Sequence, residues 1–219
     1  MGESALIRQN SHIPTVEGIL KEIVQSNVPL SFSQIHIVVA LHLLSHLRSL
    51  GRYRLSSELA ISGTTARTIL RRLQKHEIVS ATSKSGLKKG HALTEKGSTL
   101  ALEIKSRADI LSEPVNLGSL TVGVVDAIVH VPARWVKDSF KPLEARDAAV
   151  SIGARGCTVI NYGKNGLEVG DKILSESSIR KLPPSNLQPH DLLHVGTADT
   201  FEIARLGAVA ASLCSWKKE

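Results

Sequence analysis

The stretch ISGTTARTILRRLQKHEIV at residues 61–79 constrains the fold more than any other part of the chain. Its apolar residues recur at the i, i+3, i+4 and i+7 spacing of one helix face, which predicts an α-helix over about residues 63–75. The apolar face comprises Ala66, Ile69, Leu70 and Leu73. The opposite face comprises Thr64, Arg67, Thr68, Arg71 and Lys75. This second face combines cations with hydroxyl groups and holds no carboxylate. It therefore indicates binding to an anionic partner whose hydrogen-bonding groups such side chains recognise, rather than a face that only contacts solvent.

The positive charge of the chain is concentrated around this predicted helix. The 219 residues carry a formal net charge of +7. Residues 51–100 hold ten Lys and Arg against three Asp and Glu, whereas residues 111–219 hold twelve of each. The whole excess therefore lies in fifty residues, which is the distribution expected of a phosphate-binding surface.

Composition narrows the remaining possibilities. Two cysteines, Cys157 and Cys214, are too few for a disulfide framework and lack metal-ligand spacing. No apolar run is long enough to cross a bilayer, so we expect a cytoplasmic protein that does not enter the membrane. Aromatic residues make up only 3% of the chain, which disfavours single-stranded nucleic acid as the partner because such sites stack bases on aromatic rings.

The predicted helix belongs to a larger pattern in the first half of the chain. Capping residues and periodicity predict earlier helices at about residues 15–26, 33–50 and 55–60. The third of these, LSSELA, is joined to the 63–75 helix by a short turn, which is the helix-turn-helix pattern. Strands at 78–82 and 92–93 enclose the basic loop SKSGLKKGH, so a β-hairpin wing with Lys84, Lys88 and Lys89 is predicted.

Three histidines fall on the predicted 33–50 helix. His42 and His46 are four residues apart on its polar side, but the helix supplies no further metal ligand, so we predict no metal site. His36 points into the apolar arc and is expected to be a hydrogen-bonded core or interface residue. That arc spans nearly half the circumference, which makes this the expected central helix of the domain.

The run LSSELAISGTTARTILRRLQKHEIVS, the basic hairpin and LTEKG at residues 93–97 together resemble winged helix-turn-helix transcriptional regulators of the MarR and biotin-repressor kind, particularly archaeal ones. The resemblance covers about residues 30–110. It implies binding to double-stranded DNA. Glu77 departs from the pattern, since these proteins often have Gly after the recognition helix.

A helix capped by Thr94 is predicted to extend to about Leu111, with Leu100 and Ile104 on its apolar face. In the family that the chain resembles, such a helix often dimerises, and two recognition helices would then match half-sites one helical turn apart. Docking on its own domain is the equally weighted alternative.

Residues 112–118 mark the predicted domain boundary. The chain beyond them alternates predicted strands (120–131, 157–162, 167–169, 192–197) with predicted helices (143–152 and from Asp199 to about Ser215). We therefore predict an α+β fold: an N-terminal extension with a short helix at 1–29, a winged helix-turn-helix domain at 30–111 and a smaller mixed α/β domain at 112–219.

The start of the last helix has two interpretations. Asp199 and Glu202 have the spacing of a capping box, which is a structural role. Free backbone N–H groups there could also bind a small ligand, with Gly196, Thr197, Asp199 and Thr200 as the candidate residues. A capping carboxylate would occupy those donors and repel a phosphate, which favours the structural role.

No catalytic motif is present, and we expect neither an enzyme nor a bound cofactor. The leading hypothesis is a DNA-binding transcriptional regulator, acting as a homodimer, whose C-terminal domain senses a small-molecule effector or mediates assembly. The predicted DNA contacts are Thr64, Thr65, Arg67, Thr68 and Arg71 to bases, and Arg72, Lys75, Lys84, Lys88 and Lys89 to phosphates. The alternatives are an enzymatic or metabolite-binding C-terminal domain with a regulatory winged helix, and a winged helix that docks on another protein.

Overall fold

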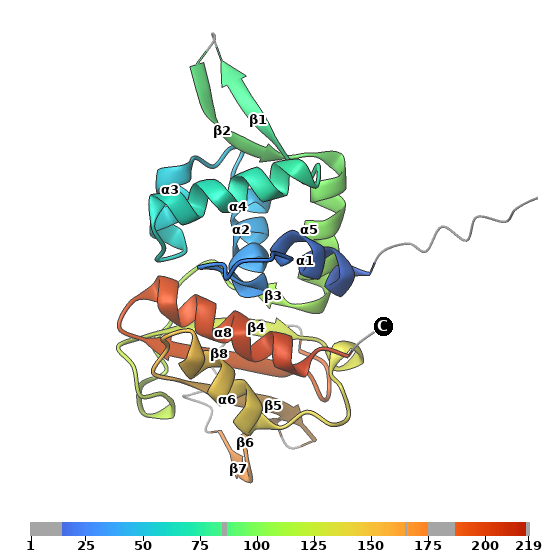
Figure 1. Cartoon of the computed structure of the whole chain (residues 1–219). Coiled ribbons are helices and arrows are strands. Elements are labelled where there is room, and N and C mark those ends of the chain that lie inside the picture. The colour runs from blue at the N-terminus through green and yellow to red at the C-terminus, as the bar shows by residue number, and fades with distance from the viewer. Residues whose placement is uncertain (1–14, 85–86, 165, 175–186, 218–219) are drawn as a thin grey trace, which may run out of the picture.

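The computed structural model describes residues 15–84, 87–164, 166–174 and 187–217, and side chains within 83–89 are not described. The chain forms two domains stacked on each other, with a β-hairpin projecting from the first domain away from the second (Figure 1). The structure is thus a winged helix followed by a smaller domain built on an antiparallel sheet, in agreement with the predicted α+β fold class.

The first domain consists of helices and a two-stranded hairpin in the order expected of a winged helix. Its elements are α1 (Val16–Val24), α2 (Gln34–His46), α3 (Arg52–Glu58), α4 (Gly63–Lys75), β1 (Val79–Lys84), β2 (Leu87–Leu93) and α5 (Glu95–Arg107). Thr15, Ser62 and Thr94 cap α1, α4 and α5 with their side-chain oxygens, because each accepts a hydrogen bond from a backbone N–H of the first turn.

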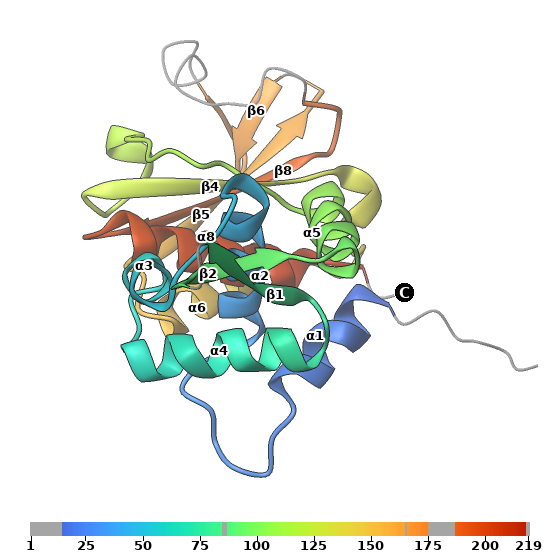
Figure 2. The same cartoon turned by 90° about the horizontal axis from the view of Figure 1, so that it is seen from above.

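Helix α2 lies near the middle of the molecule when it is seen from above (Figure 2). Every residue from His36 to Leu41 is buried, as are Leu43 and Leu44. The sequence shows an apolar arc wider than one neighbour can cover, and the structure explains it: α1 and α5 pack on α2 from the first domain, and α8 (Phe201–Ser215) packs on it from the second. No partner chain is required to bury this helix.

In the described residues, the second domain is a six-stranded antiparallel sheet with helices on one face. The strand order is β3-β4-β8-β5-β6-β7. The strands are β3 (Asp109–Ile110), β4 (Val125–Val131), β5 (Gly156–Gly163), β6 (Gly166–Val169), β7 (Lys172–Ile173) and β8 (Leu192–Ala198). The described part of the domain also contains the 3-10 turns η1 (Gly118–Leu120) and η2 (Ala133–Trp135) and helix α6 (Pro142–Ser151).

Helices α8 and α6 cover the sheet face that turns toward the first domain. Gly196 in β8 permits the close approach of α8, since a Cβ there would lie 2.2 Å from the Ala204 carbonyl oxygen. The core on this face is continuous with that of the winged helix, and it runs from Val16 in α1 to Trp216 after α8. The two domains therefore share one hydrophobic core. A second, smaller core occupies the opposite face of the sheet.

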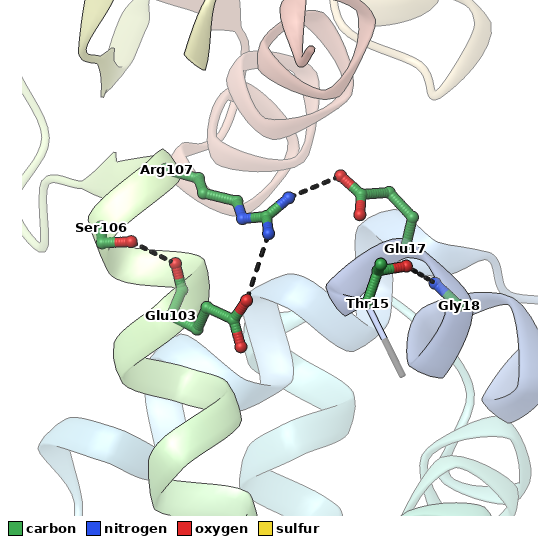
Figure 3. Close-up of polar contacts among 6 residues, drawn as sticks. All are labelled: Thr15, Glu17, Gly18, Glu103, Ser106 and Arg107. Carbon is green, nitrogen blue, oxygen red and sulfur yellow. Dashed lines mark hydrogen bonds and ion pairs between the residues drawn. The ribbon is translucent and has the colours of Figure 1, made fainter. Parts of the chain in front are cut away.

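Arg107, the last residue of α5, is fully buried where the domains meet. Its guanidinium donates to Glu17 Oε1 of α1 at 2.7 Å and to Glu103 Oε1 of α5 at 3.1 Å (Figure 3). On the side of the second domain, the guanidinium lies over the rings of Trp135 at 4.4 Å and Trp216 at 5.9 Å. One side chain thus joins both ends of the first domain to the second through ion pairs and cation–π contacts.

Most predicted elements are present, but several boundaries were wrong. Helix α2 ends at His46 rather than at Leu50, because Leu50 pairs with His91 of the hairpin. Helix α5 ends at Arg107 rather than at Leu111, because residues 109–110 join the sheet of the second domain as β3. The last helix begins after Thr200, whose side chain is its cap, so the capping box of Asp199 and Glu202 is wrong.

Replacement of Arg107 by Met should lower the free energy of unfolding by about 3 kcal/mol, because it leaves a partly buried carboxylate of Glu17 without its partner. Denaturant unfolding followed by circular dichroism measures this. Arg146→Met on the exposed side of α6 is the matched control and should change the free energy by less than about 0.5 kcal/mol. A loss below about 1 kcal/mol for Arg107→Met would contradict the importance of this contact.

The buried His194 should make the free energy of unfolding depend on pH. It is fully buried in β8, with Nε2 at 3.1 Å from Ser215 Oγ, and burial lowers its pKa from 6.5 to about 3. Below pH 6.5 the unfolded chain binds a proton that the folded chain does not, so the stabilising contribution is lost as the pH falls toward 3. The loss reaches about 1.4 kcal/mol per pH unit for one histidine. His194→Gln should flatten the acid limb of the stability profile, and an unchanged slope would contradict the assignment.

Candidate nucleic-acid interface

The turn between α3 and α4 is fixed by local hydrogen bonds. Ser62 Oγ accepts from the Thr65 N–H at 3.1 Å, and the Ile61 N–H donates to the Ser56 carbonyl at 3.0 Å. Ala60 adopts a left-handed conformation with φ of 51°, which reverses the chain within the turn. These contacts hold α4 at a set angle to α3, as a helix-turn-helix requires.

Helix α4 has the two faces that its sequence predicts. Ala66, Ile69, Leu70 and Leu73 are buried in the core of the first domain. Thr64, Arg67, Arg71 and Lys75 are exposed, and Thr68 is half-buried with its hydroxyl donating to the Thr64 carbonyl at 3.1 Å. The exposed face is thus cationic along the length of the helix.

Two predicted DNA contacts face inward instead. Thr65 is buried, and its hydroxyl lies 2.9 Å from Ser31 Oγ and 3.0 Å from Ser62 Oγ, so it is not available to a base. Arg72 donates to the carbonyls of Ile23 and Gln25 at 2.8 Å each, which satisfies the C-terminal end of α1. We therefore remove Thr65 and Arg72 from the candidate interface.

The hairpin is anchored beside the start of α3. Leu50 and His91 exchange two backbone hydrogen bonds, at 2.8 and 3.0 Å, which add a short third segment to the pair β1–β2. Gly90 is required at this crossing, because its φ is 145° and a Cβ would lie 3.0 Å from the Leu50 carbonyl group. The wing is therefore held in a defined position relative to α4. The side chains of Lys84, Lys88 and Lys89 lie outside the described residues, so their predicted phosphate contacts stay a prediction.

A groove of about 570 Å³ separates α4 from the wing. Arg67, Arg71 and Gln74 line it from α4, and Arg52 and Tyr53 line it from the start of α3. Arg52 donates to the Tyr53 hydroxyl at 2.6 Å and lies over its ring at 4.5 Å, while Tyr53 as a whole remains 73% exposed. None of the described lining residues is a carboxylate, so the groove is suited to a polyanion.

Sequence reasoning missed Arg52 and Tyr53, because α3 was expected to begin only at residue 55. The helix starts three residues earlier, at Arg52, and this extra turn brings both side chains to the groove. The signal available in the sequence is Gly51, which directly follows the predicted 33–50 helix and is the N-cap residue of α3.

The LTEKG segment has a structural explanation. Thr94 Oγ1 accepts from the Gly97 N–H at 3.0 Å and donates to the Glu77 carbonyl at 2.6 Å, which ties the start of α5 to the end of α4. A Cβ at Gly97 would lie 2.0 Å from the Ile78 carbonyl oxygen, so only glycine fits there. Glu77 has φ of 61°, the conformation that glycine usually adopts after a helix, and the Ile78 N–H closes the helix end on the Leu73 carbonyl at 2.8 Å.

The residues predicted to bind a small ligand at the start of α8 make contacts within the second domain. Gly196 packs against α8, and Thr197 is buried with its hydroxyl accepting from the Gly123 N–H at 2.8 Å. Asp199 pairs with Arg155 at 2.8 Å, and Thr200 caps α8. These four residues stabilise the junction of β8 and α8, and their predicted role in binding a ligand is not supported by this geometry.

His36 is a core residue, as expected, and its Nδ1 accepts from the Ser33 N–H at 3.1 Å. The rings of His42 and His46 lie 4.5 Å apart. Within the described residues, no group of three or more His, Cys, Asp or Glu side chains is placed to hold a metal ion. No helix in the described part of the chain is long and apolar enough to cross a membrane.

Comparisons with known proteins bear mainly on the fold. Residues 124–215 match a family described as "Domain of unknown function (DUF4443)", and these residues span β4 to α8. The hypothetical protein PH0730 from Pyrococcus horikoshii OT3 is 24% identical, with 81% of this chain and 90% of that chain covered and a TM-score of 0.62. The architecture of both domains is therefore shared with that protein. No curated protein matches the chain.

Two regulators of known structure match the chain more weakly. MepR, a transcription regulator of the Staphylococcus aureus multidrug efflux pump MepA, is 18% identical over 42% of this chain and 63% of its own, with a TM-score of 0.32. A Mycobacterium tuberculosis MarR family protein in complex with salicylic acid is 25% identical over 41% of this chain and 68% of its own, with a TM-score of 0.30.

The left-handed residue after α4 leads to a stability prediction. Glu77→Gly should raise the free energy of unfolding by about 0.5–1 kcal/mol, because glycine adopts this conformation without the cost that a side chain carries. Thermal or denaturant unfolding measures the change. The control is Glu77→Ala, which removes the same side chain and its 3.9 Å contact with Lys96 but keeps the strain, and it should bring no gain. Equal stabilisation by both variants would contradict the explanation.

Proposed function

We propose that this protein is a transcriptional regulator that binds double-stranded DNA through α4 and the wing. The observation that carries the proposal is the groove between them, in which Arg52, Arg67 and Arg71 gather without an opposing carboxylate among the described lining residues. A duplex offers phosphates to such a surface from both sides of its major groove, and the exposed face of α4 fits into that major groove.

The dimensions of α4 support this placement. Its 13 residues correspond to a length of about 20 Å. The major groove is about 12 Å wide, which admits one α-helix. With α4 in the groove, the hairpin that projects beside it would reach the adjacent backbone, and its basic residues would contact phosphates there (Figure 1).

The residues of the interface divide into two groups. Thr64, Arg67, Thr68 and Arg71 lie on α4 where base edges would be, and arginine pairs with guanine through two parallel hydrogen bonds. Lys75, at the end of α4, together with Arg52 would contact phosphates and position the protein without selecting a sequence.

We further propose that the protein acts as a homodimer without catalytic activity of its own, and that the second domain controls the first in response to a small molecule. Leu100 and Ile104 of α5 are buried within this chain, so a dimer would form through other residues. Leu102, which is 69% exposed on the same helix, is one available contact.

The two groups of residues make different predictions for DNA binding. Arg67→Ala should change the preferred sequence and cost about 1–3 kcal/mol on the preferred site. Lys75→Ala should weaken binding to all duplexes similarly and reduce the slope of log K against log salt by about one. Selection of bound duplexes from a random pool, followed by titration at several salt concentrations, measures both. Arg146→Ala removes a charge from α6, far from α4, and serves as the control with unchanged binding.

If the full-length protein retards no duplex at low salt, the proposal fails and docking on another protein becomes the better explanation of the winged helix. If Arg67→Ala and Lys75→Ala reduce binding equally across all sequences, DNA binding stands but the division between base and phosphate contacts does not.

A further inference from the structure

Helix α3 is a short element that forms one wall of the proposed DNA groove. Its seven residues correspond to a length of about 10 Å. Arg52 and Tyr53 of its first turn line the groove beside α4, whereas Glu58 at its other end contacts the second domain. A helix of this length has little stability of its own, so the contacts at its two ends decide where its first turn lies.

The start of α3 is held by the wing. Leu50 immediately precedes the N-cap residue Gly51 and exchanges backbone hydrogen bonds with His91 of β2. Leu55, on the inner side of α3, is fully buried in the hydrophobic core. These contacts hold the first turn and the inner side of the helix.

The end of α3 is held by the second domain through Arg205 of α8. The Arg205 side chain is only 3% exposed, and its Nη2 donates to the Glu58 carbonyl oxygen at 2.7 Å and to Glu58 Oε2 at 3.0 Å. The last carbonyl groups of a helix have no N–H partner within the helix, so this guanidinium supplies a donor from another domain. Its positive charge also interacts favourably with the negative end of the helix dipole.

Arg205 is itself held in position by its own helix. It belongs to the 15-residue α8, which packs on the sheet and on α2. Its guanidinium lies over the ring of Phe201, one turn earlier on α8, at 5.1 Å. On the other side of the contact, Arg54 Nε lies 3.6 Å from Glu58 Oε1, so the carboxylate binds one cation of α3 and one of α8. A long, well-packed helix therefore holds the end of a short one.

We propose that Arg205 is a positioning residue for DNA binding: by holding the end of α3 it keeps Arg52 and Tyr53 at the groove, so that the second domain contributes to DNA affinity without any effector. The proposal rests on the proposed function, since it concerns the affinity of the same groove. It makes the second domain a permanent part of the DNA-binding unit.

A contact that only stabilised the junction of the two domains would affect DNA binding differently. Its loss would lower the fraction of folded protein, and this effect would combine independently with the loss of any phosphate contact. A positioning contact acts through Arg52, so the variant without Arg205 has already lost most of what Arg52 contributes. The two explanations therefore differ in what they predict for pairs of substitutions.

The test measures the affinity of the full-length protein for a duplex that the wild-type protein retards, at several salt concentrations. Arg205→Met should weaken binding about fivefold and lower the slope of log K against log salt by about one, because Arg52 no longer reaches a phosphate. Arg155→Met is the matched control. It removes a charge from the exposed pair with Asp199, beside the start of α8, and should change the affinity by less than about twofold.

Pairs of substitutions separate positioning from stability. Arg52→Ala alone should weaken binding about fivefold, whereas in the Arg205→Met background it should weaken binding by less than about twofold. Lys75→Ala, on α4, should reduce the affinity by the same factor in both backgrounds. Equal losses for Arg52→Ala in the two backgrounds, or unchanged binding by Arg205→Met, would overturn the proposal.

Glu58→Ala is a second variant, and it leaves the buried cation in place. The Glu58 side chain is 25% exposed, so the fold tolerates its removal, and Arg205 keeps the Glu58 carbonyl as an acceptor. Removal of a negative charge would by itself tighten binding to DNA. Loss of half of the contact with Arg205 should instead weaken binding by about twofold, and tighter or unchanged binding would contradict the positioning role.

Hydrogen exchange tests the contact without DNA. The Leu59 N–H donates to the Leu55 carbonyl at 3.0 Å and reports on the end of α3, while the Ala66 N–H donates to the Ser62 carbonyl at 3.0 Å and reports on α4. Arg205→Met should accelerate exchange at Leu59 by at least about fivefold and leave Ala66 unchanged. Equal acceleration at both amides, or none at Leu59, would overturn the proposal. Failure of the wild-type protein to retard any duplex would instead refute the proposed function.

Discussion

The arrangement of the two domains depends on the contacts that the buried Arg107 guanidinium makes with both of them. A charge removed from water must be compensated, and here two carboxylates provide part of that compensation (Figure 3). Two indole rings from another part of the chain provide the rest. The segments of Trp135 and Trp216 are joined by a backbone bridge between Val136 and Trp216 and by a hydrogen bond from the Lys217 N–H to the Trp135 carbonyl at 2.7 Å. The same side chain therefore fixes α1, α5 and the C-terminal end of the chain at once.

The sequence predicts α4 and its two faces well, because periodicity and the cap at Ser62 are local signals. It fails where the partner is distant in the chain. Arginine is a residue type typical of phosphate contacts, but the Arg72 side chain donates to a carbonyl at the end of α1 instead. Asp199 has the spacing of a cap, but Thr200 caps α8 and Asp199 pairs with the distant Arg155 instead. Arg107 has one local partner, Glu103 four residues earlier on α5, but its other partners lie as far away as α1 and the C-terminal end of the chain and leave no local signal.

Helix α3 connects the cationic groove beside α4 to helix α8 of the second domain. It is short, its start lies beside the cationic groove and its end is bonded to Arg205 of α8. A helix of seven residues has little independent stability, so its position depends on contacts at both ends. Local contacts of this kind respond to small changes in free energy more readily than the packed core does.

The common core of the two domains also decides how the protein can be divided. Helix α2 is covered in part by α8, and the strand β3 belongs to the sheet although it directly follows α5. A cut near residue 111 would expose an apolar side of α2 and remove an edge from the sheet, so neither fragment would keep its native surface. Modular exchange of the winged helix onto another second domain would therefore require redesign of α2 itself, and not only of a linker.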